Sequence, residues 1–158
     1  MKTKPPPPKP WIGSKPKAFV LGCDSTAFYT NSNGERCPVL FNTVFNLGGS
    51  DLRYFASIQK NLGKLGLENS MYLYVQNLIP DYQDDETSKN KQWNKLAKQY
   101  IPERRAEFDK IDPDGKLPVF LTSERLYKVL INPGRKITFS ISALPNGECY
   151  DSGRKEPS

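Results

Sequence analysis

Short apolar runs alternate along the chain with stretches in which apolar residues recur every three or four positions. The runs predict four strands, at Ala18–Leu21, Tyr72–Val75, Val119–Leu121 and Ile137–Ala143. The first three runs are almost entirely apolar, which is typical of strands covered on both faces of a sheet.

Helical spacing predicts two helices between the first three strands. The first covers residues 52–65, with Ser50 placed to cap its start and Gly66 to end it. The second covers residues 93–108, where Pro102 is expected to break or kink the helix.

A third predicted helix, over residues 126–130 and capped by Ser123, continues the alternation of strands and helices. Right-handed crossovers then give an α/β fold with three layers, α/β/α, around a mostly parallel sheet of about four strands. Such sheets bind ligands at the carboxyl ends of their strands. Candidate site residues should therefore follow the strands, at 22–26, 76–81, 122–124 and 144–147.

The chain predicts one domain, over residues 18–150, between two tails. Residues 1–17 hold five lysines, six prolines and no acidic residue, so we expect a disordered arm that favours polyproline II. Of the formal charge of +6, only +1 then remains for residues 18–158. The arm either keeps the chain in solution or makes salt-dependent contact with DNA phosphates. Residues 151–158 form the second tail.

Composition excludes several classes of function. No apolar run approaches the roughly 18 residues that cross a bilayer, and no signal peptide is visible, so we expect a cytoplasmic monomer. The three cysteines, Cys23, Cys37 and Cys149, lack the spacing of a disulfide framework or a metal site, and we expect reduced thiols, no metal and no cofactor. The chain has no histidine, which excludes catalytic triads with a histidine base.

Asp24 directly follows the first predicted strand, where a carboxylate can orient or deprotonate water. An aspartate in this place is also a common loop acceptor or helix cap.

Five segments, taken in order, resemble the uracil-DNA glycosylase superfamily. Val20–Thr26 resembles the family's strand followed by G-x-D-P. Phe45, which precedes Gly49–Leu52, resembles the base-stacking phenylalanine that precedes a serine-leucine helix in the family. Tyr74–Pro80 resembles the strand that ends in its base-reading asparagine. The last two segments are Pro118–Arg125, which is similar to the strand and helix before the second catalytic motif, and Leu144–Gly147, which stands at that motif.

The resemblance implies a monofunctional DNA glycosylase, which flips a damaged or non-standard base into a pocket and hydrolyses its N-glycosidic bond. It implies that Asp24 and Asn146 are catalytic. It places Phe45 against the face of the base, Asn77 on its Watson–Crick edge and Cys23 beside it. Each residue also has a structural interpretation: Phe45 as core, Asn77 as a strand-end turn residue, and Asn146 as part of an Asn-Gly hairpin turn.

Two departures from the family's pattern leave other functions open. Ser25 replaces the proline of the first motif, and the second motif has no histidine. A catalytically inactive relative that binds bases or DNA is therefore an alternative. A flavodoxin-like binder of small molecules is another, although no glycine-rich phosphate loop follows the first strand.

DNA is the expected partner. Candidate contacts to its phosphates are Ser123 and four basic residues near the end of the chain, Arg135, Lys136, Arg154 and Lys155. These side chains are equally compatible with an ordinary solvated surface.

Overall fold

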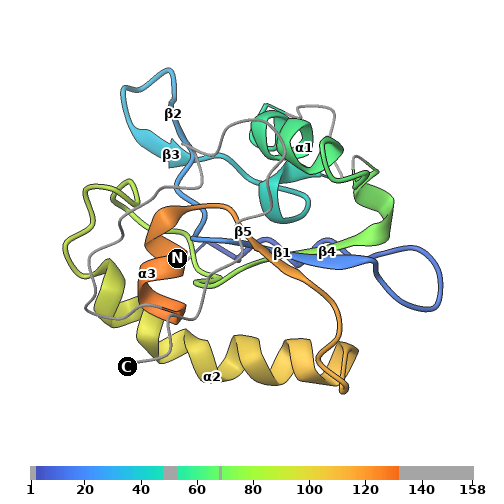
Figure 1. The fold of residues 1–158 in the computed structure, drawn as a ribbon. Coiled ribbons are helices and arrows are strands. Elements are labelled where there is room, and N and C mark those ends of the chain that lie inside the picture. The colour runs from blue at the N-terminus through green and yellow to red at the C-terminus, as the bar shows by residue number, and fades with distance from the viewer. Residues whose placement is uncertain (1–2, 48–52, 68, 132–158) are drawn as a thin grey trace.

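The computed structural model describes residues 3–47, 53–67 and 69–131. In these ranges three parallel strands form an open sheet in the order β4-β1-β5 (Figure 1). They are β1 (Ala18–Gly22), β4 (Leu73–Asn77) and β5 (Val119–Leu121). The predicted α/β fold with a mostly parallel sheet is confirmed. The fourth predicted strand, Ile137–Ala143, lies outside the described residues.

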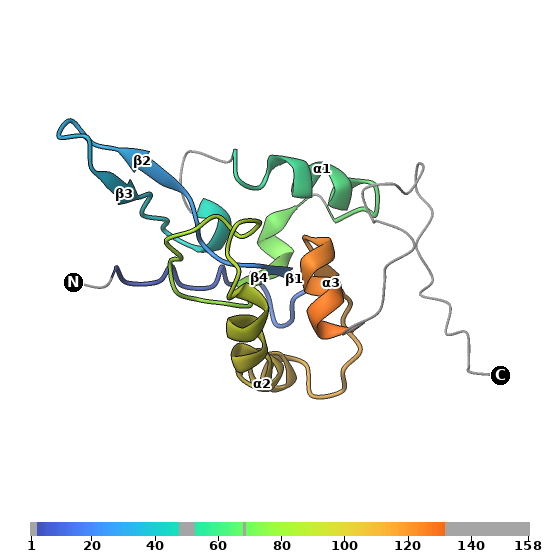
Figure 2. The ribbon, with the colours of Figure 1, turned by 90° about the vertical axis from the view of Figure 1, so that its left-hand side faces the viewer.

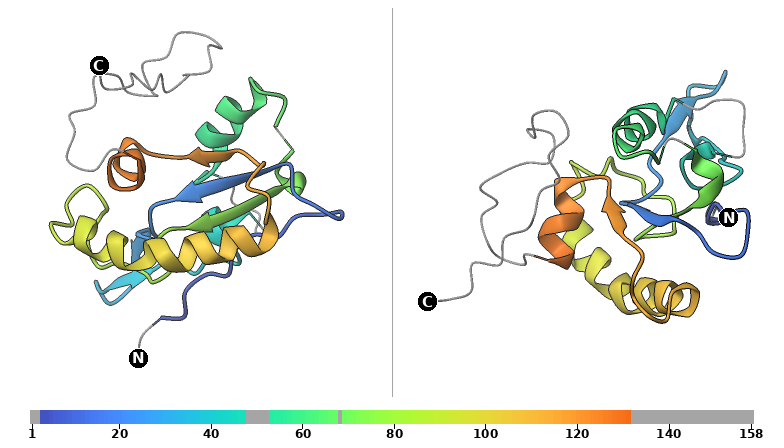
Figure 3. Two further views of the ribbon diagram at one scale, coloured as in Figure 1. Left: turned by 60° about the horizontal axis from the view of Figure 1, so that its bottom comes forward. Right: turned by 45° about the vertical axis from the view of Figure 1, so that its right-hand side comes forward.

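Helices cover both faces of the sheet, which gives three layers (Figure 3). The helix α1 (Ala56–Gly63) packs on one face. The helices α2 (Trp93–Ile111) and α3 (Glu124–Leu130) pack on the other. Every residue of β1 and β4 is buried, because these strands have an apolar layer on each side.

Alternate side chains of β1 feed the two apolar layers. Ala18 and Val20 lie in the cluster on the α1 side, whereas Leu21 and Cys23 lie in the cluster on the side of α2 and α3. Because successive side chains of a strand point to opposite faces, Val20 and Leu21 lie on opposite sides of the sheet.

The predicted helices are present, with corrected ends. α1 starts at Ala56, later than expected, and Ser50 lies outside the described residues. Gly66 adopts φ 71° after the helix, and the N–H of Leu67 donates to the carbonyl of Leu62, as in a left-handed helix termination. α2 continues through Pro102, so of the expected break or kink the break does not occur; the proline lies on the exposed side of this 19-residue helix.

The expectation of a disordered arm is wrong for residues 3–17, which lie along the outer edge of β4. Lys9 pairs antiparallel with Val75, by N–H···O distances of 2.9 and 3.1 Å, and the ring centroid of Trp11 is 5.7 Å from that of Tyr74. Lys9 stands between two prolines and still carries an N–H, so it can pair with an edge strand. The arm therefore belongs to the domain.

A hairpin that the apolar pattern did not predict projects from the sheet between β1 and α1 (Figure 2). Its strands are β2 (Phe28–Thr30) and β3 (Arg36–Pro38). Two 3-10 turns, η1 (Val44–Asn46) and η2 (Ser70–Tyr72), complete the described elements.

Candidate functional site

The carboxyl ends of β1 and β4 meet in register, because Gly22 pairs with Asn77. The chain that follows β1 is tied to the chain that follows β4 by two backbone bonds, from Leu78 N–H to the Gly22 carbonyl (2.8 Å) and from Ile79 N–H to the Cys23 carbonyl (3.0 Å). Parallel strands thus bring two of the predicted site segments, 22–26 and 76–81, to one edge of the sheet.

Phe45 and Asn77 both lie against Gly22. A Cβ atom placed on Gly22 would stand 2.3 Å from Asn77 Oδ1 and 2.7 Å from the Cε2 and Cζ atoms of Phe45. Asn77 Oδ1 and the edge of the ring are therefore no more than 5.0 Å apart, since each lies within the given distance of one point. Only a glycine at position 22 leaves room for this approach.

Asn77 is buried with half of its amide unpaired. The side chain is 3% exposed, and its Nδ2 donates to Ser25 Oγ at 3.2 Å. Its Oδ1 accepts no hydrogen bond from any described residue. A buried carbonyl oxygen without a donor costs about 1–3 kcal/mol, so this atom is prepared to accept an N–H from a ligand.

The backbone at Phe45 is strained. Phe45 and Asn46 have φ angles of 58° and 56°, a region that costs a residue with a side chain of order 1 kcal/mol or more. The N–H of Val44 donates to the carbonyl of Pro7 at 3.0 Å, so the N-terminal arm helps to hold this turn. Strain of this kind is common at ligand sites, and here it presents the Phe45 ring to Gly22.

The carboxylate of Asp24 is held by two donors. Thr87 Oγ1 donates to Oδ1 at 2.8 Å, and the indole Nε1 of Trp93 donates to Oδ2 at 2.7 Å. Burial raises the pKa of Asp24, although these two hydrogen bonds and the charge of Arg125 act in the opposite direction. A carboxylate with a raised pKa is a better proton acceptor than an ordinary surface aspartate.

Arg125 supports the loop that contacts Asp24. Its Nη1 donates to the carbonyl of Thr87 at 2.6 Å, and its guanidinium carbon lies 5.3 Å from the centre of the Trp93 ring. Thr87, Trp93 and Arg125 were absent from the residues that the sequence predicts for the site. No sequence pattern links these three residues to Asp24, because they lie far from it in the chain and contact its surroundings only in the folded structure.

Cys23 and Ser123 contact each other where β1 and β5 end. Cys23 Sγ lies 3.2 Å from Ser123 Oγ, and burial raises the pKa of the Cys23 thiol to about 11. Ser123 stands at the start of α3, but its side chain makes no capping hydrogen bond, so the capping role expected for its hydroxyl is wrong. The thiol is neutral and packs with the apolar layer on the side of α2 and α3.

The predicted site residues thus fall into four groups, one of which is the contact between Cys23 and Ser123. Phe45 and Asn77 are brought together on Gly22, with Phe45 packed on the α1 side. Asp24 follows at the same edge, but its carboxylate is turned towards Trp93 on the opposite side of the sheet. The remaining candidates lie outside the described residues: Asn146, Arg135, Lys136, Arg154 and Lys155.

Within the described ranges, no three potential ligand side chains are grouped to hold a metal ion, and no helix has the length and apolarity to cross a bilayer. No protein-family model, no curated protein and no solved structure matches the chain. The relationship to the uracil-DNA glycosylase superfamily therefore stays a prediction.

Proposed function

We propose that this protein takes a nucleobase everted from DNA into a pocket at Gly22, Phe45 and Asn77, which we call the base pocket, and hydrolyses its N-glycosidic bond. The observation that supports this best is the unpaired, buried Oδ1 of Asn77 next to the ring of Phe45. A base provides an N–H on its edge for the unpaired oxygen and a planar face for the aromatic ring.

The free acceptor favours some bases over others. Uracil and thymine carry an N–H at ring position 3, which can donate to Asn77 Oδ1, whereas cytosine has an unprotonated nitrogen there. Ser25 supports this selection, because its hydroxyl accepts from Asn77 Nδ2 and so turns Oδ1 towards the Phe45 side. The serine that replaces the expected proline thus gains a role in orienting the base-reading amide.

Asp24 is the group that we assign to hydrolysis. The oxygen of a water molecule bonds to the sugar C1′ as the C1′–N bond breaks, and the electron pair of that bond leaves with the base. Asp24 accepts one proton from the water, and the departing base takes up one proton from solvent. Burial of the carboxylate at the same edge of the sheet supports this assignment, since it raises the pKa of Asp24.

Two assays test the proposal. Equilibrium dialysis with labelled uracil should detect binding by the wild type and a loss of at least tenfold in Asn77→Ala, with Asn61→Ala on the exposed surface of α1 as the matched control. Duplexes with one uracil, one G·T mismatch or one hypoxanthine are then scored for abasic sites. Equal uracil binding by all three proteins would refute the pocket.

A non-catalytic base-binding protein is the second candidate. It is favoured by the geometry of Asp24, whose two oxygens already accept bonds from Thr87 and Trp93 and point away from the Phe45 side. It is also favoured by the absence of histidine from the sequence. If the wild type binds uracil but forms no more abasic product than Asp24→Asn on every duplex, this candidate replaces the hydrolase.

A further inference from the structure

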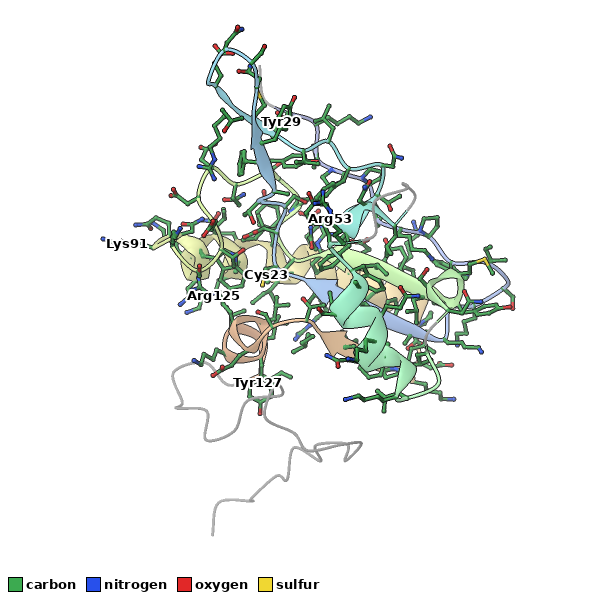
Figure 4. The ribbon with its side chains drawn as sticks, turned by 90° about the horizontal axis from the view of Figure 1, so that it is seen from above. Cys23, Tyr29, Arg53, Lys91, Arg125 and Tyr127 are labelled. Carbon is green, nitrogen blue, oxygen red and sulfur yellow. The ribbon has the colours of Figure 1, made fainter. Side chains whose placement is uncertain are left out.

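An open groove of about 620 Å³ lies between residues 88–91 and the first turns of α3. Its lining contains four basic side chains and one acidic one: Lys89, Lys91, Arg125, Lys128 and Glu124. Figure 4 shows Arg125 and Lys91 on the same flank of the molecule, with Cys23 nearer its centre. We call this feature the basic groove.

The cations of the basic groove are available to an anion. Lys91 makes no ion pair with any described residue. Lys128 pairs with Glu124 at 3.1 Å, and Lys89 pairs with Glu86 at 2.9 Å, but all four side chains are at least 41% exposed. Exposed pairs of this kind contribute at most about 1 kcal/mol, so a phosphate can replace either carboxylate at little cost.

One wall of the groove is preorganised. Arg125 is held by the carbonyl of Thr87 and by the Trp93 ring, so its guanidinium does not lose further freedom when an anion binds. A side chain that is already fixed binds an anion with a smaller loss of conformational entropy than a free lysine.

We propose that the basic groove binds backbone phosphates of the DNA strand whose base enters the base pocket. This inference rests on the proposed function. The two features are connected through two hydrogen bonds. Thr87, which precedes Ser88 of the groove, donates to Asp24, and Asn77 donates to Ser25, which follows Asp24. The groove therefore adjoins Thr87, the residue that donates to Asp24. Four cations against one carboxylate match a polyanion better than a neutral or acidic partner.

The double variant Lys91→Ala/Lys128→Ala tests this site, and Lys95→Ala/Lys98→Ala is its matched control. The control also removes two exposed lysines, but from the part of α2 that does not line the groove. Fluorescence anisotropy with a labelled duplex is measured from 50 to 200 mM salt. Each lost phosphate contact should flatten the dependence of log K on log salt by about 0.9, so the groove variant should lose about 1.8 in slope.

Free uracil separates this inference from the proposed function. The groove variant should bind uracil like the wild type, because the base pocket is untouched. If the slope of log K against log salt falls in the groove variant but no protein binds uracil, the groove is retained and the base pocket is refuted. The groove is refuted if the groove variant and the control shift the slope equally, or if inorganic polyphosphate binds to the groove while the duplex does not.

Discussion

Gly22→Ala introduces one methyl group into the tightest point of the base pocket. The new Cβ would lie 2.3 Å from Asn77 Oδ1 and 2.7 Å from two atoms of the Phe45 ring, and real Cβ atoms essentially never approach below 3.0 Å. Asn77 cannot move away easily, since it is 3% exposed and bonded to Ser25. Phe45 is only partly buried, so we expect its ring to be displaced.

The magnitude follows from two opposing effects. Overpacking of a buried site costs about 1–3 kcal/mol, whereas replacing glycine by alanine in an extended strand returns about 0.4–1 kcal/mol through the unfolded state. We expect a net loss of about 1 kcal/mol, which is roughly 0.5 M in the urea midpoint for an m value of about 2 kcal/mol/M. Uracil binding should fall further, by about 10- to 100-fold, because the Oδ1 acceptor is blocked.

Urea unfolding measures the loss of stability, and uracil dialysis on the same preparations measures the loss of uracil binding. A double-mutant cycle with Phe45→Leu supplies the control, because the smaller side chain relieves the contact of the methyl group with the ring but not its contact with Asn77 Oδ1. Gly22→Ala should then cost less stability in the Phe45→Leu background, while uracil binding stays weak in both. An unchanged urea midpoint together with unchanged uracil binding in Gly22→Ala would refute the close packing of the base pocket.

Three further predictions concern buried groups outside this contact. At pH 8 the Cys23 thiolate should be about a hundredfold less abundant than for a thiol of pKa 9.0, so peptide mapping should show slow alkylation by iodoacetamide until the protein is unfolded. Leu126→Ala, at a fully buried position of α3, should lower the free energy of unfolding by about 2–5 kcal/mol in urea titrations, whereas a loss below 1 kcal/mol would contradict its place in the core. Burial raises the pKa of Asp24, so the folded state holds this proton more tightly than the unfolded state, and stability falls as pH rises from the unfolded pKa through the folded one. The difference between the urea midpoint of Asp24→Asn and that of the wild type should therefore shift in favour of the variant as the pH rises from 3 to 7. A shift in the other direction would show that the hydrogen bonds to Asp24 outweigh its burial.

The sheet was the part of the fold that the sequence predicted best. Val119–Leu121 is β5 without change, and β1 extends the predicted Ala18–Leu21 by one residue. The prediction for β4 ended two residues early, because Gln76 and Asn77 are polar and yet buried. Gln76 donates to Glu107 and Asn77 donates to Ser25, and partners so far away in the chain are invisible to a hydropathy pattern.

The hairpin and the arm were missed for different reasons. The Asn33-Gly34 pair is a recognised hairpin turn, and Gly34 has φ 78°, so a signal was present between strands that are only three residues long. The arm has few apolar side chains, but its backbone pairs with β4 and its Pro6 and Pro16 are buried. Amino-acid composition shows that the arm has few apolar side chains, but it cannot show that the backbone of the arm pairs with β4.

The site was predictable where it depends on topology and unpredictable where it depends on loops. Residues 22–25 lie at the carboxyl end of the central strand, so neighbours on both sides of the sheet converge on them. Gly22 makes room for the ring and the amide on the α1 side, and Cys23, one residue further, contacts Ser123 on the other. The side chain of Asp24 then joins the 84–91 loop to α2, whereas Ser25 returns to Asn77. One strand end thus supplies a contact to each neighbouring segment. Thr87, which precedes Ser88 of the basic groove, donates to Asp24, so a change in this loop should alter the surroundings of Asp24.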